Sequence, residues 1–160
     1  MIEILKDLPP FGHVGYIVAN RDASVERLQS ILGIDNFILY DFVPNKAWVA
    51  GKEIFDCKLK IAVGTFKNNV KLEIIEPISG NTPHKGYLSK IGSGIHHIAF
   101  YSDRYDEWHE YFEEKGAAFI FEMEAEDDVI GYRRSFYAEM EGFQGILEIT
   151  EIAKKKSHAK

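Results

Sequence analysis

The chain has 160 residues, of which 46% are hydrophobic and 28% are charged, a composition that is typical of a soluble globular protein and argues against disorder. The formal net charge of −6 disfavours nucleic-acid binding. No apolar stretch approaches the length of a membrane span, and the N-terminus carries no signal-peptide pattern. The only cysteine is Cys57, which excludes an internal disulfide, and we expect a cytoplasmic protein without a nucleic-acid or membrane partner.

The first half of the chain predicts a β-α-β-β-β module over residues 11–76. Its helix is expected at residues 22–33, because apolar residues recur there at helical spacing and Gly33 stands where a C-terminal stop belongs. Asp22 or Ser24 can cap the start of this helix. The remaining pattern predicts strands at 11–19, 37–43, 53–63 and 70–76, with a loop at 44–51.

The second half restarts the same order over residues 95–152, after a connector rich in proline and glycine that contains a short helix near residues 86–90. A helix is expected at residues 103–116, with aromatic residues on one face and glutamates on the other. Residues 153–160 form a basic tail that we interpret as solubilising. The pattern predicts strands at 95–101, 118–123, 130–138 and 146–152, with an acidic loop at 124–128 and a turn at 141–142.

The two halves are a tandem repeat, which is typical of modules that cannot each bury a sheet face alone. Each half places a histidine on its first strand and a glutamate on its last. His13 in the first strand matches His97, and Glu73 in Leu72-Glu73-Ile74 matches Glu148 in Leu147-Glu148-Ile149. Taken singly, a buried histidine favours a hydrogen-bonded core residue, and a glutamate in an apolar strand favours the solvent face. Their matched positions favour a shared site instead.

If the two modules pack about a pseudo-twofold axis, these four side chains converge. Two imidazoles and two carboxylates suit a divalent ion such as Zn, Co, Ni, Mn or Fe, with positions left for water or substrate. His96 and Glu76 are expected to lie outside the site, His96 because side chains alternate along a strand and Glu76 because it lies at a strand end and faces water. Core packing is favoured over pocket lining for the aromatic residues Tyr40, Phe42, Trp48, Phe136 and Tyr137.

The sequence resembles the vicinal oxygen chelate superfamily, which groups glyoxalases, bleomycin-resistance proteins and extradiol dioxygenases. The likeness covers residues 11–152, and it is strongest to methylmalonyl-CoA epimerases and their glyoxalase-like relatives in the stretches Leu72-Glu73-Ile-Ile-Glu-Pro77, Tyr87-Leu88-Ser-Lys90 and Gly94-Ile95-His96-His97-Ile98. The resemblance implies one glyoxalase-like α+β domain over residues 1–160, in which tandem βαβββ modules form a curved mixed sheet around a metal. It also implies that His13, Glu73, His97 and Glu148 bind the ion, and that the protein is a homodimer.

The activity implied is metal-dependent proton transfer α to a carbonyl in a small acyl thioester or similar substrate, as in methylmalonyl-CoA epimerase. Glu148 is the expected base, with Glu73 opposite. Two alternatives stay open: a lactoylglutathione lyase, and a non-catalytic small-molecule-binding protein of the bleomycin-resistance type. Glu73 as a fourth ligand argues against an extradiol dioxygenase, which uses two histidines and one carboxylate. The chain departs from the epimerases near residues 59–61, where it lacks their further acid/base carboxylate; Glu53 and Asp56 are the nearest acids.

Overall fold

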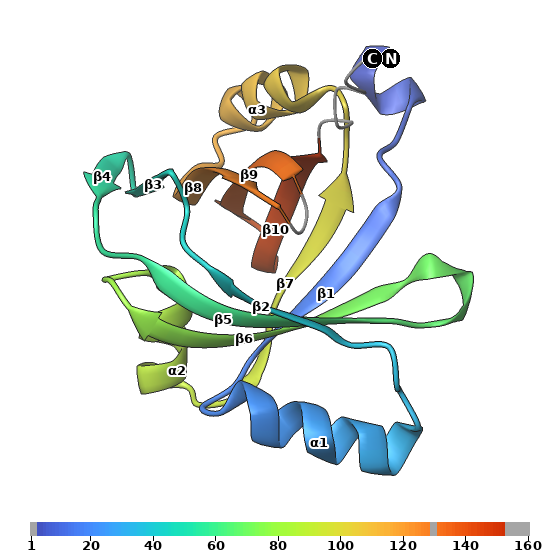
Figure 1. The fold of residues 1–160 in the computed structure, drawn as a ribbon. Helices are drawn as coiled ribbons and strands as arrows, with labels where there is room; N and C mark the ends of the chain where they lie inside the picture. Colours follow the sequence, from blue (N-terminus) through green and yellow to red (C-terminus); the bar gives the residue numbers. More distant parts are fainter. Residues whose placement is uncertain (1–2, 129–130, 153–160) are drawn as a thin grey trace, which may run out of the picture.

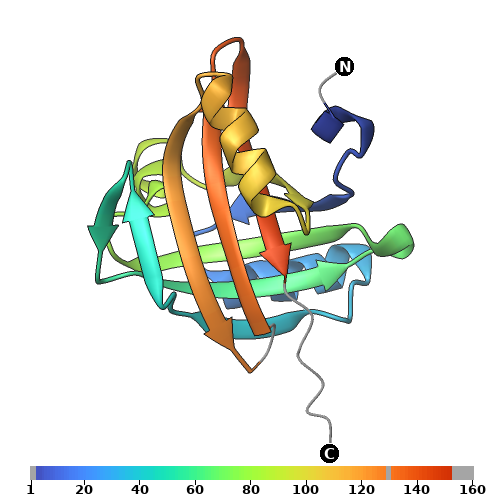
Figure 2. The same ribbon diagram turned by 90° about the horizontal axis from the view of Figure 1, so that it is seen from above.

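One mixed sheet of ten strands, strongly curled, makes up most of the molecule in the computed structural model, which describes residues 3–128 and 131–152 (Figure 1). The predicted basic tail at 153–160 and the predicted start of a strand at residue 130 lie outside the described residues. Helices cover the convex side of the sheet, and the concave side encloses a cavity (Figure 2). Within the described part of the chain, no helix is long and apolar enough to cross a membrane.

The sequence order of the elements follows the predicted repeat in the second half. In the first half a further strand forms at 46–49, and the single strand predicted at 53–63 is two strands, at 52–54 and 58–65. The helices are α1 (Arg21–Leu32), α2 (Pro83–Lys90) and α3 (Tyr105–Glu114), with short 3-10 turns at Glu3–Lys6 and Lys67–Asn69. The strands are β1 (Phe11–Ile17), β2 (Ile38–Phe42), β3 (Lys46–Val49), β4 (Lys52–Ile54), β5 (Lys58–Thr65), β6 (Lys71–Ser79), β7 (Gly94–Tyr101), β8 (Ala118–Asp127), β9 (Gly131–Met140) and β10 (Phe143–Ile152).

The strand order β2-β5-β6-β1-β7-β10-β9-β8-β3-β4 is nearly symmetric about its centre. β1 and β7 pair antiparallel at the centre, and each is flanked by the last strand of its own repeat in a parallel pairing, β6 beside β1 and β10 beside β7. Each repeat thus brings its first and last strands together, and the two repeats join along β1 and β7. The division into modules at 11–76 and 95–152 stays an interpretation of this repeat.

Two segments predicted as loops are strands. Residues 46–49, inside the predicted loop, form β3, which pairs with β8 of the second repeat and with β4. Because β8 is far away in the sequence, local pattern gives no sign of this pairing. Residues 124–127 continue β8, where Phe121, Met123 and Ala125 are buried and the intervening glutamates face outward. The glutamates of the acidic run therefore lie on the outer face of an amphipathic strand, whereas Asp127 lies on the same face as Ala125 and pairs with Arg133.

The helix ends follow local side-chain chemistry. Asn20, rather than Asp22 or Ser24, caps α1: its Oδ1 accepts from the amide of Ala23 at 2.9 Å. Gly33 ends the helix at φ 66°, a left-handed conformation that favours glycine. In α3, Tyr105, Trp108 and Phe112 are buried against Phe136 and Ile149 beneath the helix, as the aromatic face of this helix predicted.

A β-bulge in β7 changes which side chains are buried there. Gly15 pairs with His97 while the next residue, Tyr16, pairs with Ile95, so that His96 is the extra residue of the bulge. Strict alternation would place His96 and His97 on opposite faces. Because of the bulge both are buried, at 5% and 2% exposure, and Ile95 is the exposed residue.

Candidate metal centre

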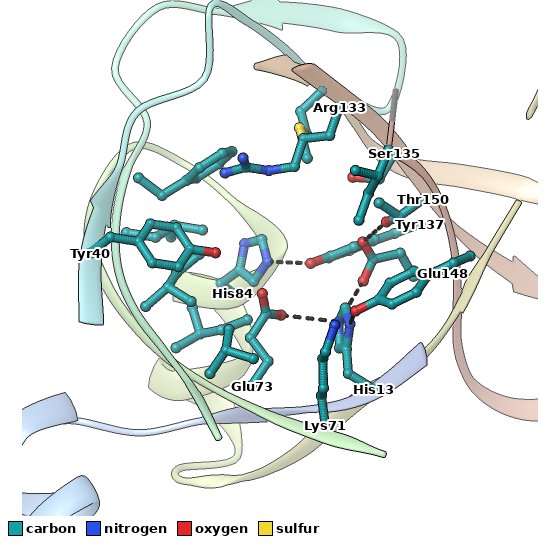
Figure 3. A pocket seen from close by; sticks show the side chains of 18 of the residues that line it. His13, Tyr40, Lys71, Glu73, His84, Arg133, Ser135, Tyr137, Glu148 and Thr150 are labelled. Atoms are coloured by element: carbon teal, nitrogen blue, oxygen red, sulfur yellow. Dashed lines mark hydrogen bonds and ion pairs between the residues drawn. The ribbon is translucent and has the colours of Figure 1, made fainter. Parts of the chain in front are cut away.

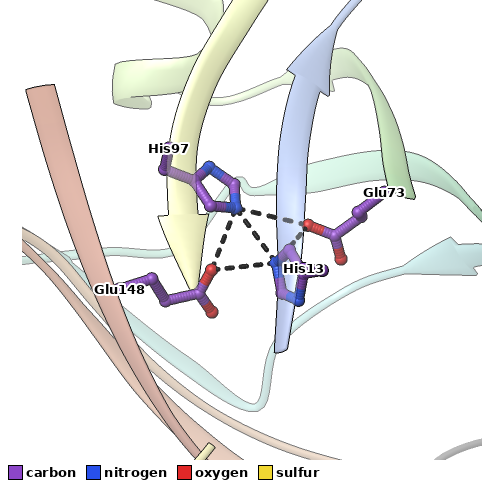
Figure 4. Close-up of side chains that lie close together, drawn as sticks. All are labelled: His13, Glu73, His97 and Glu148. Carbon is purple, nitrogen blue, oxygen red and sulfur yellow. Dashed lines mark hydrogen bonds and ion pairs between the residues drawn. The ribbon is translucent and has the colours of Figure 1, made fainter. Parts of the chain in front are cut away.

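The four residues singled out by the repeat come together at the middle of the sheet. His13 lies on β1, Glu73 on β6, His97 on β7 and Glu148 on β10, which are four neighbouring strands (Figure 4). One potential ligand atom from each residue lies within 4.8 Å of all the others. Glu73 is half-buried and the other three are buried. Their role as metal ligands stays a prediction, but the convergence on which it depends is present.

The spacing of these atoms fits a single ion. The Nε2 atoms of His13 and His97 lie 3.1 Å apart, and the carboxylate oxygens of Glu73 and Glu148 lie between 2.9 and 3.5 Å from them. Ligands about 2.1 Å from a common ion stand about 3.0 Å apart at right angles and about 3.4 Å apart at the tetrahedral angle. The buried Oε2 of Glu148 faces this centre, 2.9 Å from Nε2 of His97 and 3.2 Å from Nε2 of His13. The residues present therefore fit a divalent ion.

The charges of the cluster favour a cation. Burial disfavours the charged form of His13, but the carboxylates of Glu73 and Glu148 outweigh it and raise the pKa of His13 well above its usual value. Burial likewise opposes ionisation of Glu73, yet His13 lowers the pKa of Glu73 to about 2. The pKa of Glu148 lies well below its usual value, against burial and because of both histidines. Protons on the imidazoles thus neutralise the carboxylates here, a role that a bound cation can take over.

Neighbouring groups fix the orientation of three of the four candidate ligands. The outer nitrogen of His13, Nδ1, lies 2.9 Å from the hydroxyl of Tyr101, and Nδ1 of His97 lies 3.0 Å from Nδ1 of His96. When Nε2 serves as a ligand, Nδ1 carries the proton and donates to these partners. Thr150 donates its hydroxyl to Oε1 of Glu148. His96 is not one of the four clustered residues, as expected, but it does not lie on the opposite face from His97, because the bulge turns its ring onto His97.

Burial keeps two further histidines near the cluster, His84 and His96, neutral. His96 is buried beside His84, and burial followed by the charge of His84 lowers its pKa to about 2. Burial also lowers the pKa of His84 to about 3, and Nε2 of His84 contacts the hydroxyl of Tyr137 at 3.0 Å (Figure 3). The sequence alone gave no signal for His84, which lies on α2. Glu76 lies outside the site as expected, but it is half-buried rather than wet and accepts a hydrogen bond from the amide of Arg21 at 2.8 Å.

A glycine provides the space for His97. Gly15 faces His97 across the β1–β7 pairing, and a Cβ atom at Gly15 would lie 2.0 Å from Cε1 of the His97 ring. The ring of Tyr137 packs on the other side of His97, with centroids 4.7 Å apart. The imidazole therefore occupies a slot that any larger residue at position 15 would close.

The cluster forms one end of a cavity of about 200 Å³ enclosed by the curl of the sheet. Tyr40, Phe42 and Tyr137 line this cavity as well as packing in the core, whereas Phe136 is a core residue and Trp48 borders a separate groove near α3. The cavity walls are mostly apolar, with polar groups supplied by Lys71, His84, Tyr101, Arg133, Ser135 and Thr150.

The two walls that flank the cluster differ, although the repeat places them symmetrically. On β5, Val63 pairs with Glu73, and Ile61 and Leu59 follow at alternate positions; on β9, Tyr137 pairs with Glu148, and Ser135 and Arg133 follow. All six line the cavity. One wall is thus apolar and the other polar. Glu53 and Asp56 are exposed on the surface, so among the described residues that line the cavity the only carboxylates are Glu73 and Glu148.

Solved structures of similar fold include methylmalonyl-CoA epimerases. The enzyme from Mycobacterium tuberculosis superposes with a TM-score of 0.68 at 18% identity, covering 93% of this chain and 91% of that one. A Streptomyces coelicolor methylmalonyl-CoA epimerase in complex with 2-nitronate-propionyl-CoA gives a TM-score of 0.63 at 19% identity, covering 92% and 100% of the two chains. These likenesses confirm the predicted glyoxalase-like α+β fold.

Sequence comparison gives one curated relative, the uncharacterised protein YqjC of Bacillus subtilis, which is 48% identical over 42 residues. The match covers 26% of this chain and 30% of the length of that relative. A family match is much more extensive and spans residues 12–132. The chain belongs to the glyoxalase/bleomycin resistance protein/dioxygenase superfamily, whose members are typically metal-dependent.

Proposed function

We propose that the protein is a divalent-metal-dependent enzyme that moves a proton α to the carbonyl of a small acyl thioester or similar substrate, as methylmalonyl-CoA epimerase does. The observation that carries the proposal is the cluster of two imidazoles and two carboxylates at one end of an enclosed cavity. The solved neighbours act on or bind coenzyme A thioesters, which supports this substrate class.

His13, Glu73, His97 and Glu148 would hold the ion. When bound, a divalent ion supplies Lewis acidity that polarises a substrate carbonyl and lowers the pKa of the adjacent C–H bond. The apolar cavity walls keep bulk water away from the reacting carbon, which strengthens the electrostatic interactions inside.

Glu148 is the proposed base. A carboxylate oxygen that binds an ion is a poor base, so Oε2 of Glu148 would have to leave the ion when the substrate binds, and it then takes the proton from the α carbon. Thr150 keeps Oε1 in place through its hydrogen bond. Glu73 enters the cluster from the strand on the other side of β1 and β7, and can return a proton from there. Removal on one side and delivery on the other inverts the carbon without net oxidation or reduction, and transfer to a neighbouring carbon gives the isomerase reaction instead.

The test combines metal analysis with proton exchange. Purified protein is stripped with chelator and reloaded separately with Zn, Co, Ni, Mn and Fe(II), and one equivalent of at least one of these ions should remain bound. Incubation with malonyl-type and 3-oxoacyl thioesters in D₂O should then introduce deuterium at the α position.

The variant Glu148→Gln keeps an oxygen ligand but cannot accept the proton, so exchange should fall by at least about 100-fold with metal content unchanged. Glu73→Gln, measured in parallel, shows whether Glu73 takes the same role. Exchange at the wild-type rate in Glu148→Gln would place the base elsewhere. Tight ligand binding without exchange for any thioester or hemithioacetal would favour a binding protein, and turnover of hemithioacetals alone would favour a lactoylglutathione lyase.

A further inference from the structure

A buried guanidinium in the cavity has no part in the proton transfer proposed above. Arg133 lies on β9, and Figure 3 shows it on the opposite side of the cavity from Glu73 and His13. Its side chain is about as buried as the core, with 5% of the residue exposed. The guanidinium carbon lies 4.9 Å from the ring centre of Phe42 and 5.8 Å from that of Tyr40. A positive charge is thus held against aromatic rings inside an apolar cavity.

The hydrogen-bonding capacity of Arg133 is only partly used. Nη1 donates to Oδ2 of Asp127 at 2.8 Å. Nη2 is also buried, and among residues 3–128 and 131–152 it has no acceptor. A buried donor on a charged group that lacks an acceptor is costly, and its cost disappears when a ligand oxygen reaches it. Arg133 therefore offers a molecule in the cavity an N–H donor that has no acceptor among the described residues.

Strand register places this donor well away from the metal cluster. Glu148 pairs with Tyr137 on β9, and Arg133 is four residues further along the same strand on the same face. At about 3.3 Å per residue, the backbone of Arg133 lies about 13 Å along β9 from that of Tyr137, which is the level of Glu148. Between these two levels the cavity is lined by Ile61, which lies between Val63 and Leu59 on β5, and by Met123, which pairs with Ser135. A ligand that fills the cavity meets the His/Glu cluster at one end and Arg133 at the other, and between them it meets mainly apolar side chains together with the hydroxyl of Ser135.

We propose that Arg133 binds a carboxylate on the acyl part of the substrate, at the end of the cavity remote from the His/Glu cluster. The substrate class is then a carbonyl compound with a short apolar spacer and a terminal carboxylate. A single free nitrogen, on a guanidinium already paired with Asp127, suits a singly charged carboxylate better than a phosphate. This inference rests on the proposed function only in placing the carbonyl at the cluster.

The test compares two ligands that differ only at the terminal carbon. α-Ketoglutarate and α-ketovalerate share the ketoacid group that can reach the cluster and have equal carbon chains, but only α-ketoglutarate ends in a carboxylate. Titration calorimetry with the zinc-loaded protein should show α-ketoglutarate binding about 10- to 100-fold more tightly, the effect expected of one charge-assisted buried hydrogen bond. α-Ketoadipate and α-ketocaproate repeat the comparison with a longer spacer.

Arg133→Gln should abolish the preference for the dicarboxylates while leaving the affinity for α-ketovalerate within about threefold. Arg134→Gln is the matched control, because Arg134 is the next residue on the outer face of β9, where it pairs with Asp106 and Glu151, and its loss should leave the preference intact. Arg133→Lys keeps the charge but not the planar fork and should retain part of the preference.

Two outcomes would overturn the assignment. The first is that the wild-type protein binds both members of each ligand pair equally, a result that does not depend on the folding of any variant. The second is that folded Arg133→Gln keeps the preference for the dicarboxylates. The proposed proton transfer fails separately. Absence of α-proton exchange with a preserved dicarboxylate preference would refute that reaction and leave Arg133 as a carboxylate site.

Discussion

Replacement of Gly15 by alanine should damage the candidate metal centre without changing any of its four predicted ligands. The added Cβ would lie 2.0 Å from Cε1, 2.3 Å from Nε2 and 2.5 Å from Nδ1 of His97, far inside van der Waals contact. The imidazole cannot simply swing away, because the Tyr137 ring packs on it and the His96 ring lies 3.0 Å from its Nδ1. Either the His97 ring leaves the cluster or β1 separates from β7.

The size of the effect follows from these two routes. Overpacking in a buried site costs about 1–3 kcal/mol, which for a chain of this length lowers the melting temperature by about 2–4 °C per kcal/mol. Displacement of one of four ligands should lower metal affinity by about 100-fold or more, since loss of a supporting contact alone costs 10- to 100-fold. Melting is measured in excess EDTA so that the packing cost is seen without the metal, and affinity is measured by competition with a chelator.

Gly86→Ala is the matched control. Gly86 lies inside α2, and a Cβ atom there meets no atom within 4 Å, so alanine should leave metal affinity unchanged and stabilise the helix by up to about 1 kcal/mol. A Gly15→Ala protein with wild-type melting and wild-type metal affinity would refute the packing argument. Lowered stability with unchanged affinity would show instead that the strands move and the ligand stays.

Three further predictions concern the ligand set, pH and assembly. His97→Ala should abolish metal binding yet keep the far-UV circular dichroism spectrum, with a stability loss of about 1–3 kcal/mol; loss of that spectrum would make His97 structural. Burial lowers the pKa of His84 from 6.5 to about 3. Between these pH values the unfolded chain binds a proton at His84 that the folded chain does not. The free energy of unfolding should therefore fall as pH drops below 6.5, by up to about 1.4 kcal/mol per pH unit. His84→Gln should flatten urea-derived stability against pH in this window, and an unchanged slope would contradict a neutral buried His84. We also expect a homodimer, which sedimentation velocity at micromolar concentration tests; a single species of monomer mass at all concentrations would count against it.

The candidate ligands could be predicted from sequence because the repeat supplies an internal control. A lone histidine on a strand, or a lone glutamate, carries little information, but His13 and His97 recur with Glu73 and Glu148 at matched positions, and the four converge. The buried face of α3 could also be predicted from sequence, because a helix of that length repeats its apolar pattern over several turns.

The features that could not be predicted from sequence depend on pairing between strands that are far apart in the chain. β3 is a strand because β8 lies beside it, and residues 46–49 carry too short a pattern to indicate this. His96 contacts the site because of a one-residue bulge, and a bulge shifts every alternation argument in its strand. Nothing in the sequence distinguishes Arg133 from its neighbour Arg134, and only the register of β9 against β10 shows that Arg133 faces the cavity and Arg134 the outer surface.

The sheet is nearly symmetric around the cluster but not in the walls beside it, and this difference assigns reaction and substrate orientation to different residues. Each repeat contributes one imidazole and one carboxylate from its own parallel strand pair, so the candidate metal cluster is symmetric and neither repeat alone supplies more than half of it. The walls beside it have diverged: Leu59, Ile61 and Val63 on β5 stand opposite Arg133, Ser135 and Tyr137 on β9. A symmetric cluster between unlike walls cannot orient a substrate by itself, so orientation falls to the polar wall. Exchanging wall residues should therefore change which substrate binds, whereas exchanging cluster residues should change whether any substrate reacts.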